Sequence, residues 1–325
     1  MKKTVSFILG ALLALSLFAG CAQGASSGTV SHPDSSAAQS GEEKLVVYAS
    51  FYPVYDFAKN IGKDRIELIN MVPAGTEPHD WEPAPTDIVG LENAQVFIYN
   101  GAGMEHWVDS VLSGLSNQDL LVVEASKGIE LMEGHTHEED EHEGEEAAEE
   151  EEAMDPHVWL NPQYAKVEAE NIKNALVQAD PDNAEYYEAN YTEYAAKLDA
   201  LDQKMEEALN PLENKTIVVA HEAFGYLCAR YGLTQVGIEG LSPDSEPDAA
   251  RMAEIIEFVK ANDVKVIFFE ELVSPKVAET IADETGSATD VLNPLEGLSE
   301  DDIAAGQDYI TVMEKNLDAL VNALA

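Results

Sequence analysis

Short apolar segments rich in β-branched residues alternate with amphipathic segments along most of the chain after residue 44. The apolar segments predict strands over 45–49, 66–72, 96–99 and 120–124, and again over 216–220, 235–239, 264–269 and 289–292. Amphipathic segments between them predict helices, among them 52–61, 86–93, 104–112, 224–231 and 248–261. Strands separated by helices are typical of parallel sheets built from βαβ units. We therefore predict an α/β protein of two lobes, each with a four-stranded, mainly parallel sheet flanked by helices.

A long helical stretch separates the two α/β patterns. Asn161 and Pro162 supply an N-cap and a first helical position, and Pro181 restarts the helix. Residues 182–209 contain no Gly or Pro and predict one long, rigid helix that joins the lobes. The expected domains are an N-terminal lobe at 44–180, a connecting helix at 181–210 and a C-terminal lobe at 211–325.

The N-terminal segment has the pattern of an export signal. Lys2 and Lys3 precede a mainly apolar run over 5–18, which ends in small residues before Cys21. A cysteine directly after Ala-Gly resembles the bacterial lipoprotein processing site, which implies a signal peptide at 1–20 and a lipid on Cys21. A plain signal peptide or a short membrane anchor is the alternative. Residues 21–43 are rich in Ser, Ala and Gly and predict a flexible tether to the outer face of the cell membrane.

The charge of the chain is unusual, whereas its hydrophobic content of 45% is ordinary for a protein with a packed core. The chain has 18 basic and 62 acidic residues, a net charge of −44, which argues against nucleic acid as a partner. Residues 133–152 contain twelve acidic residues and no Lys or Arg, so we expect a disordered loop. The loop contains His135, His137 and His142, which could capture metal ions weakly or could belong to a solvated insertion with no effect on metal affinity.

Three further histidines follow predicted structural elements. His79 comes after the strand at 66–72, His221 directly follows 216–220, and His157 precedes the long helical stretch. Parallel α/β sheets bind ligands beyond the carboxyl ends of their strands, and neutral imidazole is a good ligand for Zn²⁺. Glu296, after the last predicted strand, could fill a fourth position. Taken alone, each residue is only a candidate, because single histidines in such proteins are usually surface or core residues.

Four motifs link these candidates to a known family. They are EPHDWEP at 77–83, DPHVWLNP at 155–162, HEAFGY at 221–226 and LNPLE at 292–296. Together with the acidic loop, they make the chain from residue 44 onward resemble the zinc-binding, membrane-attached solute receptors of ABC-type metal importers (cluster A-I, also called cluster 9). The resemblance implies a metal site in the cleft between two lobes, with His79, His157, His221 and Glu296 as ligands.

The same resemblance bears on the choice of metal and on the fourth ligand. Manganese-selective relatives typically present two imidazoles and two carboxylates, whereas three nitrogens and one oxygen favour Zn²⁺. Other branches of the family use water in place of the glutamate, so water and Glu77 are the rivals of Glu296. Glu77, Asp80 and Glu222 are also candidates to accept hydrogen bonds from the metal-binding imidazoles.

Together with the export signal, the resemblance implies a monomeric protein that captures Zn²⁺ outside the membrane and delivers it to the permease of an ABC transporter. Zinc is then a transported ligand, and no enzymatic activity is expected. One alternative is a zinc-dependent hydrolase with an open water position, although the chain lacks a His-Glu-x-x-His sequence. The other alternative is a surface adhesin, for which lipid attachment would also suit.

Overall fold

The computed structural model describes residues 44–134, 154–243 and 247–325. Within it, Glu43–Ala325 forms one compact unit. The predicted signal peptide, the tether, the lipidation site Cys21 and the acidic loop from His135 onward, with His137 and His142, lie outside the described residues. No helix in the described ranges is both long and apolar enough to cross a membrane.

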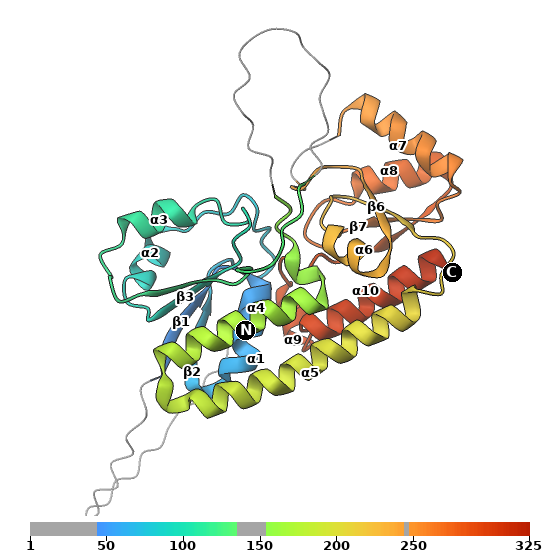
Figure 1. The fold of residues 1–325 in the computed structure, drawn as a ribbon. Coiled ribbons are helices and arrows are strands. Elements are labelled where there is room, and N and C mark those ends of the chain that lie inside the picture. The colour runs from blue at the N-terminus through green and yellow to red at the C-terminus, as the bar shows by residue number, and fades with distance from the viewer. Residues whose placement is uncertain (1–43, 135–153, 244–246) are drawn as a thin grey trace, which may run out of the picture. The chain divides into compact units, whose positions relative to one another are not determined.

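The first lobe contains a four-stranded parallel sheet (Figure 1). Its strands are β1 (Leu45–Ala49), β2 (Ile66–Asn70), β3 (Val96–Tyr99) and β4 (Leu121–Glu124), in the spatial order β2-β1-β3-β4. The connections contain α1 (Tyr52–Gly62), the 3₁₀ turn η1 (Lys63–Arg65), α2 (Pro85–Leu91) and α3 (Val108–Gly114).

The second lobe repeats this arrangement. Its strands are β5 (Thr216–Val219), β6 (Thr234–Gly237), β7 (Val266–Phe269) and β8 (Ala288–Val291), all parallel, in the order β6-β5-β7-β8. The helices α6 (Gly225–Tyr231), α7 (Ala249–Ala261) and α8 (Lys276–Thr285) connect them. The predicted fold class is therefore confirmed, with the same strand order in both sheets.

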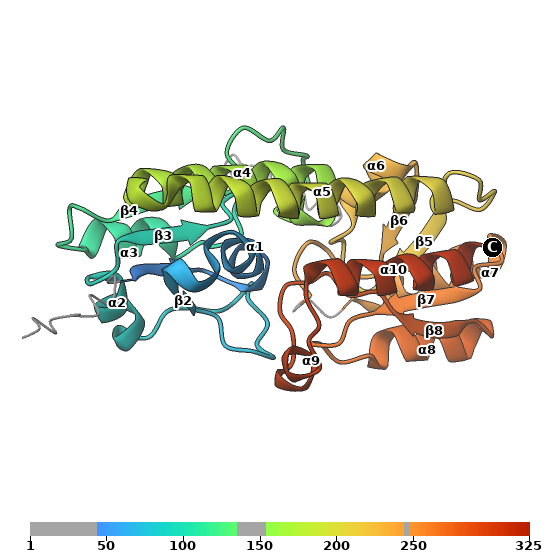
Figure 2. The same cartoon turned by 90° about the horizontal axis from the view of Figure 1, so that it is seen from below.

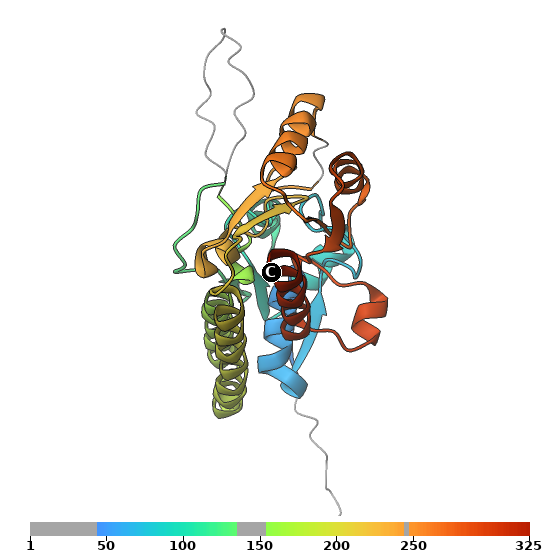
Figure 3. The same ribbon diagram turned by 90° about the vertical axis from the view of Figure 1, so that its right-hand side faces the viewer.

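Long helices run beside both sheets. After η2 (Val158–Leu160) come α4 (Pro162–Ala179), η3 (Pro181–Asn183) and α5 (Ala184–Leu209), and the chain ends with α9 (Glu300–Ala304) and α10 (Tyr309–Leu324). The 26 residues of α5 span about 39 Å. This helix packs against α1 and α4 of the first lobe and against α6 and α10 of the second (Figure 2). Figure 3 shows α10 beside α5 from the side of the C-terminus.

Alternating side chains of the strands supply two faces of core. In the first sheet, Val47 and Ala49 belong to the largest buried cluster, whereas Phe97 joins a smaller cluster with α2 and α3. The largest cluster includes Ile98 of β3 and Ile217 of β5, so one continuous core extends through both lobes. This continuity and α5 hold the strand ends of the two sheets in a fixed relation.

One helix begins later than the sequence pattern predicts. The helix expected at 104–112 covers Val108–Gly114 instead. The preceding segment is a tight loop, in which Gly101 and Gly103 have φ of 85° and 88°. The carboxylate of Glu105 accepts the backbone N–H groups of Asn100 and Gly101 at 2.8 and 3.0 Å. Because the Glu105 carboxylate is bound to the backbone of this loop, Glu105 lies before the helix, which begins three residues later at Val108.

Candidate metal centre

Four side chains that are far apart in the sequence converge at one place. His79 lies in the loop after β2, His157 directly precedes η2, His221 follows β5 and Glu296 follows β8. Among the described residues, these four form the group of ligand-type side chains whose donor atoms all lie within 4.8 Å of one another. The structure thus brings together the four residues that the sequence proposes as ligands, three of them after the carboxyl ends of strands.

The spacing of the donor atoms matches tetrahedral coordination. The Nε2 atom of His157 lies 3.3 Å from the Nε2 atoms of both His79 and His221. The Oε1 atom of Glu296 lies 3.0 Å from Nε2 of His157 and 3.3 Å from those of His79 and His221. Zinc bonds of 2.0–2.1 Å at tetrahedral angles place neighbouring ligand atoms about 3.3 Å apart. The donors therefore surround a point that suits a small, four-coordinate cation.

The second nitrogen of His157 is held by Asp155. The His157 Nδ1–H group donates to Asp155 Oδ1 at 2.8 Å, and the backbone N–H of His157 donates to the same oxygen at 2.9 Å. This bond leaves the lone pair of Nε2 free for a metal. The side chain of Tyr226, on α6, donates to the carbonyl of Asp155 at 2.8 Å. Gly225 is required beside it, because a Cβ there would lie 2.5 Å from Asp155 Oδ2.

His221 has an equivalent partner in Glu270. Its Nδ1–H group donates to Glu270 Oε1, and the exposed fractions of the two residues are 0% and 4%. Glu270 follows β7, which is paired with β5, so both residues lie at the same edge of the sheet. Sequence reasoning missed this partner and proposed Glu222 instead. The available signal was the position of Glu270 directly after a predicted strand.

The His79 loop makes a different kind of contact. Both carboxylate oxygens of Glu77 accept the backbone N–H of His79, at 3.1 and 3.0 Å, so this carboxylate shapes the loop. The backbone N–H of Gly75 donates to the carbonyl of Leu298 at 2.9 Å, which joins the His79 loop to the Glu296 loop. His79 is also the most accessible of the four candidate ligands, with 11% of its side chain exposed.

The other proposed oxygen donors lie outside the four-residue group. Asp80 is exposed, and the group formed by the described residues contains neither Glu77, Asp80 nor Glu222. Glu222 is buried, and its backbone N–H donates to the carbonyl of Gly240 at 2.9 Å. Their roles as alternative ligands or as hydrogen-bond partners of the imidazoles stay predictions.

Burial and charge shift the pKa values of the site in opposite directions. Burial alone would lower the pKa of His221, but the charges of Glu270 and Glu296 raise it well above its usual value. Burial also acts to lower the pKa of His157, yet its bonds to Asp155 and Glu296 raise it. Burial acts to raise the pKa of Glu296, but His221 and the bonds from the imidazoles hold it well below its usual range. His157 and His221 therefore hold a proton to higher pH than an ordinary histidine, and Glu296 stays ionised to lower pH than an ordinary carboxyl.

Two lobes with matching parallel sheets, and a buried cluster of three imidazoles and one carboxylate at their strand ends, define a metal-binding solute receptor. Residues 47–323 match the family described as ZnuA, zinc-uptake complex component A, periplasmic. The chain belongs to this family.

Individual relatives agree with this assignment. The chain is 47% identical over 287 residues to the high-affinity zinc uptake system protein ZnuA of Bacillus subtilis. The matched region covers 88% of this chain and 90% of ZnuA. It is 41% identical over 321 residues to the zinc-binding lipoprotein AdcA of Streptococcus pneumoniae, but spans only 60% of that longer protein. The Zn(II)-bound ZnuA-like domain of AdcA superimposes with a TM-score of 0.75 at 40% identity, over 87% of this chain and 99% of the domain.

A third relative is described as having two activities. The laminin-binding protein Lmb of Streptococcus agalactiae, described as bifunctional with adhesin and metal transporting activity, is 30% identical in sequence. It superimposes with a TM-score of 0.76 over 87% of this chain and the whole of Lmb.

Proposed function

We propose that this protein captures Zn²⁺ outside the cell membrane, holds it with His79, His157, His221 and Glu296, and delivers it to the permease of an ABC transporter. The observation that carries the proposal is the spacing of the four donor atoms, 3.0–3.3 Å for the distances given above. Three nitrogens and one oxygen favour Zn²⁺ over Mn²⁺, which prefers oxygen donors. The family to which the chain belongs and its zinc-binding relatives support the same function.

Titration of the purified protein with Zn²⁺ and Mn²⁺ tests the ligand set. We expect one tight zinc site with weaker manganese binding, and a large loss of zinc affinity in His221→Ala and Glu296→Ala. His106→Ala is the matched control, because half of that side chain is exposed and it lies outside the four-residue group. Zinc binding unchanged by both ligand substitutions would contradict the proposed site.

The proposal also includes the location of the protein and its partners. A lipid on Cys21 would tether the protein to the outer face of the membrane as a monomer, where it would meet the permease. The name of the relative AdcA as a lipoprotein supports this anchor. Labelled fatty acid should be incorporated into the full chain and not into Cys21→Ser. Delivery predicts that deletion of the gene abolishes zinc-dependent growth and that expression of the full chain restores this growth.

The two alternative functions, a hydrolase and an adhesin, make different predictions for the same four-residue group. A hydrolase needs a water in the fourth position, where Glu296 Oε1 lies beside the imidazoles. Adhesion, which the relative Lmb suggests, predicts laminin binding that persists in His221→Ala, because it does not require zinc capture. Transport predicts that His221→Ala abolishes zinc-dependent growth.

A further inference from the structure

The loop that carries Glu296 has a backbone that its own residues do not favour. Leu295 has φ of 62°, in the left-handed region that residues other than glycine rarely adopt. The loop follows β8. It must place the Glu296 carboxylate to within a few tenths of an ångström of the position from which it can share one cation with three imidazole nitrogens. Surrounding contacts must therefore hold this backbone in place.

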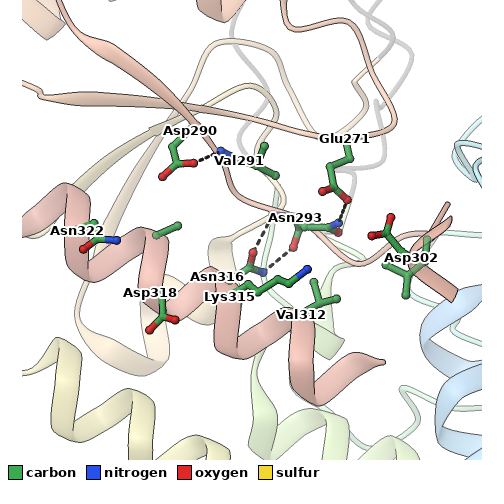
Figure 4. Close-up of a pocket in the computed structure, with 12 residues that line it drawn as sticks. Glu271, Asp290, Val291, Asn293, Asp302, Val312, Lys315, Asn316, Asp318 and Asn322 are labelled. Carbon is green, nitrogen blue, oxygen red and sulfur yellow. Dashed lines mark hydrogen bonds between the residues drawn. The ribbon is translucent and has the colours of Figure 1, made fainter. Parts of the chain in front are cut away.

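Hydrogen bonds to Asn293 hold the start of the loop. The Asn293 Oδ1 atom accepts the backbone N–H of Leu295 at 2.7 Å, and this bond spans the turn that leads to Glu296. Asn293 Nδ2 donates to Glu271 Oε2 at 2.8 Å (Figure 4). Glu271 directly follows Glu270, the partner of His221, so adjacent residues after β7 support two different ligands.

Asn316, on α10, is bonded to both backbone groups of Asn293. The Asn316 Oδ1 atom accepts the Asn293 N–H at 2.9 Å, and Asn316 Nδ2 donates to the Asn293 carbonyl at 2.7 Å (Figure 4). Only 2% of Asn316 is exposed. The amide of Asn316 thus accepts one hydrogen bond from Asn293 and donates another to it. This pair of bonds fixes both the position and the orientation of Asn293, and no apolar side chain can reproduce it.

A cavity beside these asparagines makes the hydrogen bonds more important. It has a volume of about 280 Å³ and is lined by residues of α10 together with Asn293 and Glu271. Because it leaves this side of the loop open, close packing does not enclose Asn293 there. The hydrogen bonds from α10 and from Glu271 supply the restraint that packing supplies elsewhere.

We propose that Asn316 is a positioning residue for the fourth metal ligand, acting through Asn293 to place the carboxylate of Glu296. The side-chain hydrogen bonds of Asn316 are made with Asn293 and Met313, and Asn316 is not one of the four grouped residues. It connects the terminal helix to the zinc site, and Glu271 supports the same loop through its bond with the Asn293 side chain. This inference rests on the proposed function, since it concerns how that site obtains its carboxylate.

The test measures zinc affinity in Asn316→Leu, alone and combined with Glu296→Ala. Loss of a residue that orients a metal ligand typically weakens binding about 10–100-fold, so we expect a loss of this size in Asn316→Leu. In the Glu296→Ala background the same substitution should change affinity less than about twofold. An equal loss in both backgrounds, or no loss in either, would overturn the proposal.

Cobalt supplies a readout that a general loss of stability would not produce. We expect the visible absorption spectrum of Co²⁺-loaded Asn316→Leu to shift towards that of Glu296→Ala, since both lack a properly placed carboxylate. Asn322→Leu is the matched control, because Asn322 lines the same cavity from the same helix and makes none of the bonds to Asn293. Its affinity and spectrum should equal those of the wild type.

Two gentler substitutions keep the test informative if Asn316→Leu does not fold. Glu271→Ala removes the loop's other support from an exposed position, and Asn316→Asp retains the acceptor while losing the donor to the Asn293 carbonyl. Each should lower zinc affinity only when Glu296 is present. Failure of the proposed function itself would be distinguishable, because Glu296→Ala would then bind zinc as tightly as the wild type.

Discussion

At the scale of single residues, the metal centre depends as much on buried carboxylates as on its ligands. Asp155 and Glu270 each accept a hydrogen bond from the Nδ1–H group of a proposed ligand histidine, which sets the tautomer and directs Nε2 towards the centre of the four-residue group. With Glu296 they surround the imidazoles with negative charge. This charge favours a divalent cation, and it also favours protons, which compete for the same nitrogens.

Replacing Glu270 tests which carboxylate supports His221. We expect Glu270→Ala to lower zinc affinity about 10–100-fold, because the imidazole loses the acceptor that orients it. Glu222→Ala, which alters the neighbour of His221 in sequence, should have a smaller effect. Competition titration against a chromophoric chelator measures both constants. A larger loss in Glu222→Ala would return the support of His221 to the residue that the sequence suggested.

The pH dependence of zinc binding follows from the same charges. Histidine must be neutral to bind zinc, so affinity is lost as pH falls through the pKa values of the zinc-free site. Since Glu270 and Glu296 raise the pKa of His221 well above its usual value, competition should already be visible above about pH 6.5. Glu270→Gln should shift this loss to lower pH. Titrations between about pH 8 and 5.5 measure the shift, and a flat affinity would contradict a three-histidine site.

At the scale of elements, the sequence pattern indicated the strands and the four grouped side chains better than the contacts that support them. His79, His221 and Glu296 could be placed at the carboxyl ends of strands, where parallel sheets bind ligands, whereas their proposed role as one ligand set came from the family motifs. Glu270 was not, since it stands 49 residues from His221 and becomes its neighbour only through the pairing of β7 with β5. Asn316 was equally hidden, because the packing of α10 against the Glu296 loop is a tertiary contact without a local pattern.

Helix α6 shows how an element supports a proposed ligand of the other lobe. Its first residue, Gly225, leaves room for Asp155, and Tyr226 holds the carbonyl of the same residue. The backbone N–H of Met132 also donates to the hydroxyl of Tyr226, at 2.8 Å. The Gly-Tyr end of the HEAFGY motif is thus explained by what it does for His157.

Gly225→Ala should weaken zinc binding without touching any ligand. The added Cβ would displace Asp155 from His157, and we expect a loss of about tenfold in affinity. Combined with Asp155→Ala, the substitution should have little further effect, since its target is already absent. Gly114→Ala is the control, because a Cβ there meets nothing within 4 Å. Isothermal titration of the four variants decides the matter, and additive losses would contradict the mechanism.

At the scale of the whole described unit, the lobes are joined by buried polar contacts as well as by the shared core. The Tyr309 hydroxyl, on α10, donates to the carbonyl of Trp159 at 2.6 Å, and Trp159 Nε1 donates to the carbonyl of Pro294 at 2.7 Å. These bonds run from the terminal helix to the segment beside His157 and back to the loop of Glu296. The centre is thereby built into the packing between the lobes.

Asp56 is a second buried junction of this kind. It lies on α1, 2% exposed, and accepts hydrogen bonds from the Tyr194 hydroxyl of α5 at 3.2 Å and from Asn60 of its own helix at 3.1 Å. Burial, the largest effect, and the charge of Asp308 at the start of α10 raise its pKa to about 7. Bonds from Tyr194 and from the backbone of Tyr309, and the charge of Lys59 on α1, lower it by less.

This raised pKa gives the stability of the protein a defined dependence on pH. The folded state holds the Asp56 proton more tightly than the unfolded state, so the contribution of Asp56 to stability falls as pH rises from about 4 to about 7 and then levels off. A rise in pKa from 3.8 to about 7 corresponds to a loss of about 4 kcal/mol at most. The uncharged variant Asp56→Asn should lack this loss and gain on the wild type as pH rises.

Urea unfolding of the zinc-free protein at pH 5, 6, 7 and 8 measures this difference. The stability of Asp56→Asn relative to the wild type should increase up to about pH 7 and then stay constant, because the buried carboxylate is then fully ionised. Asp109→Asn, at an exposed position on α3, should run parallel to the wild type. If Asp56→Asn also ran parallel, the charge of Asp56 would be accommodated at the junction of α1, α5 and α10, and that junction would be stable in either protonation state.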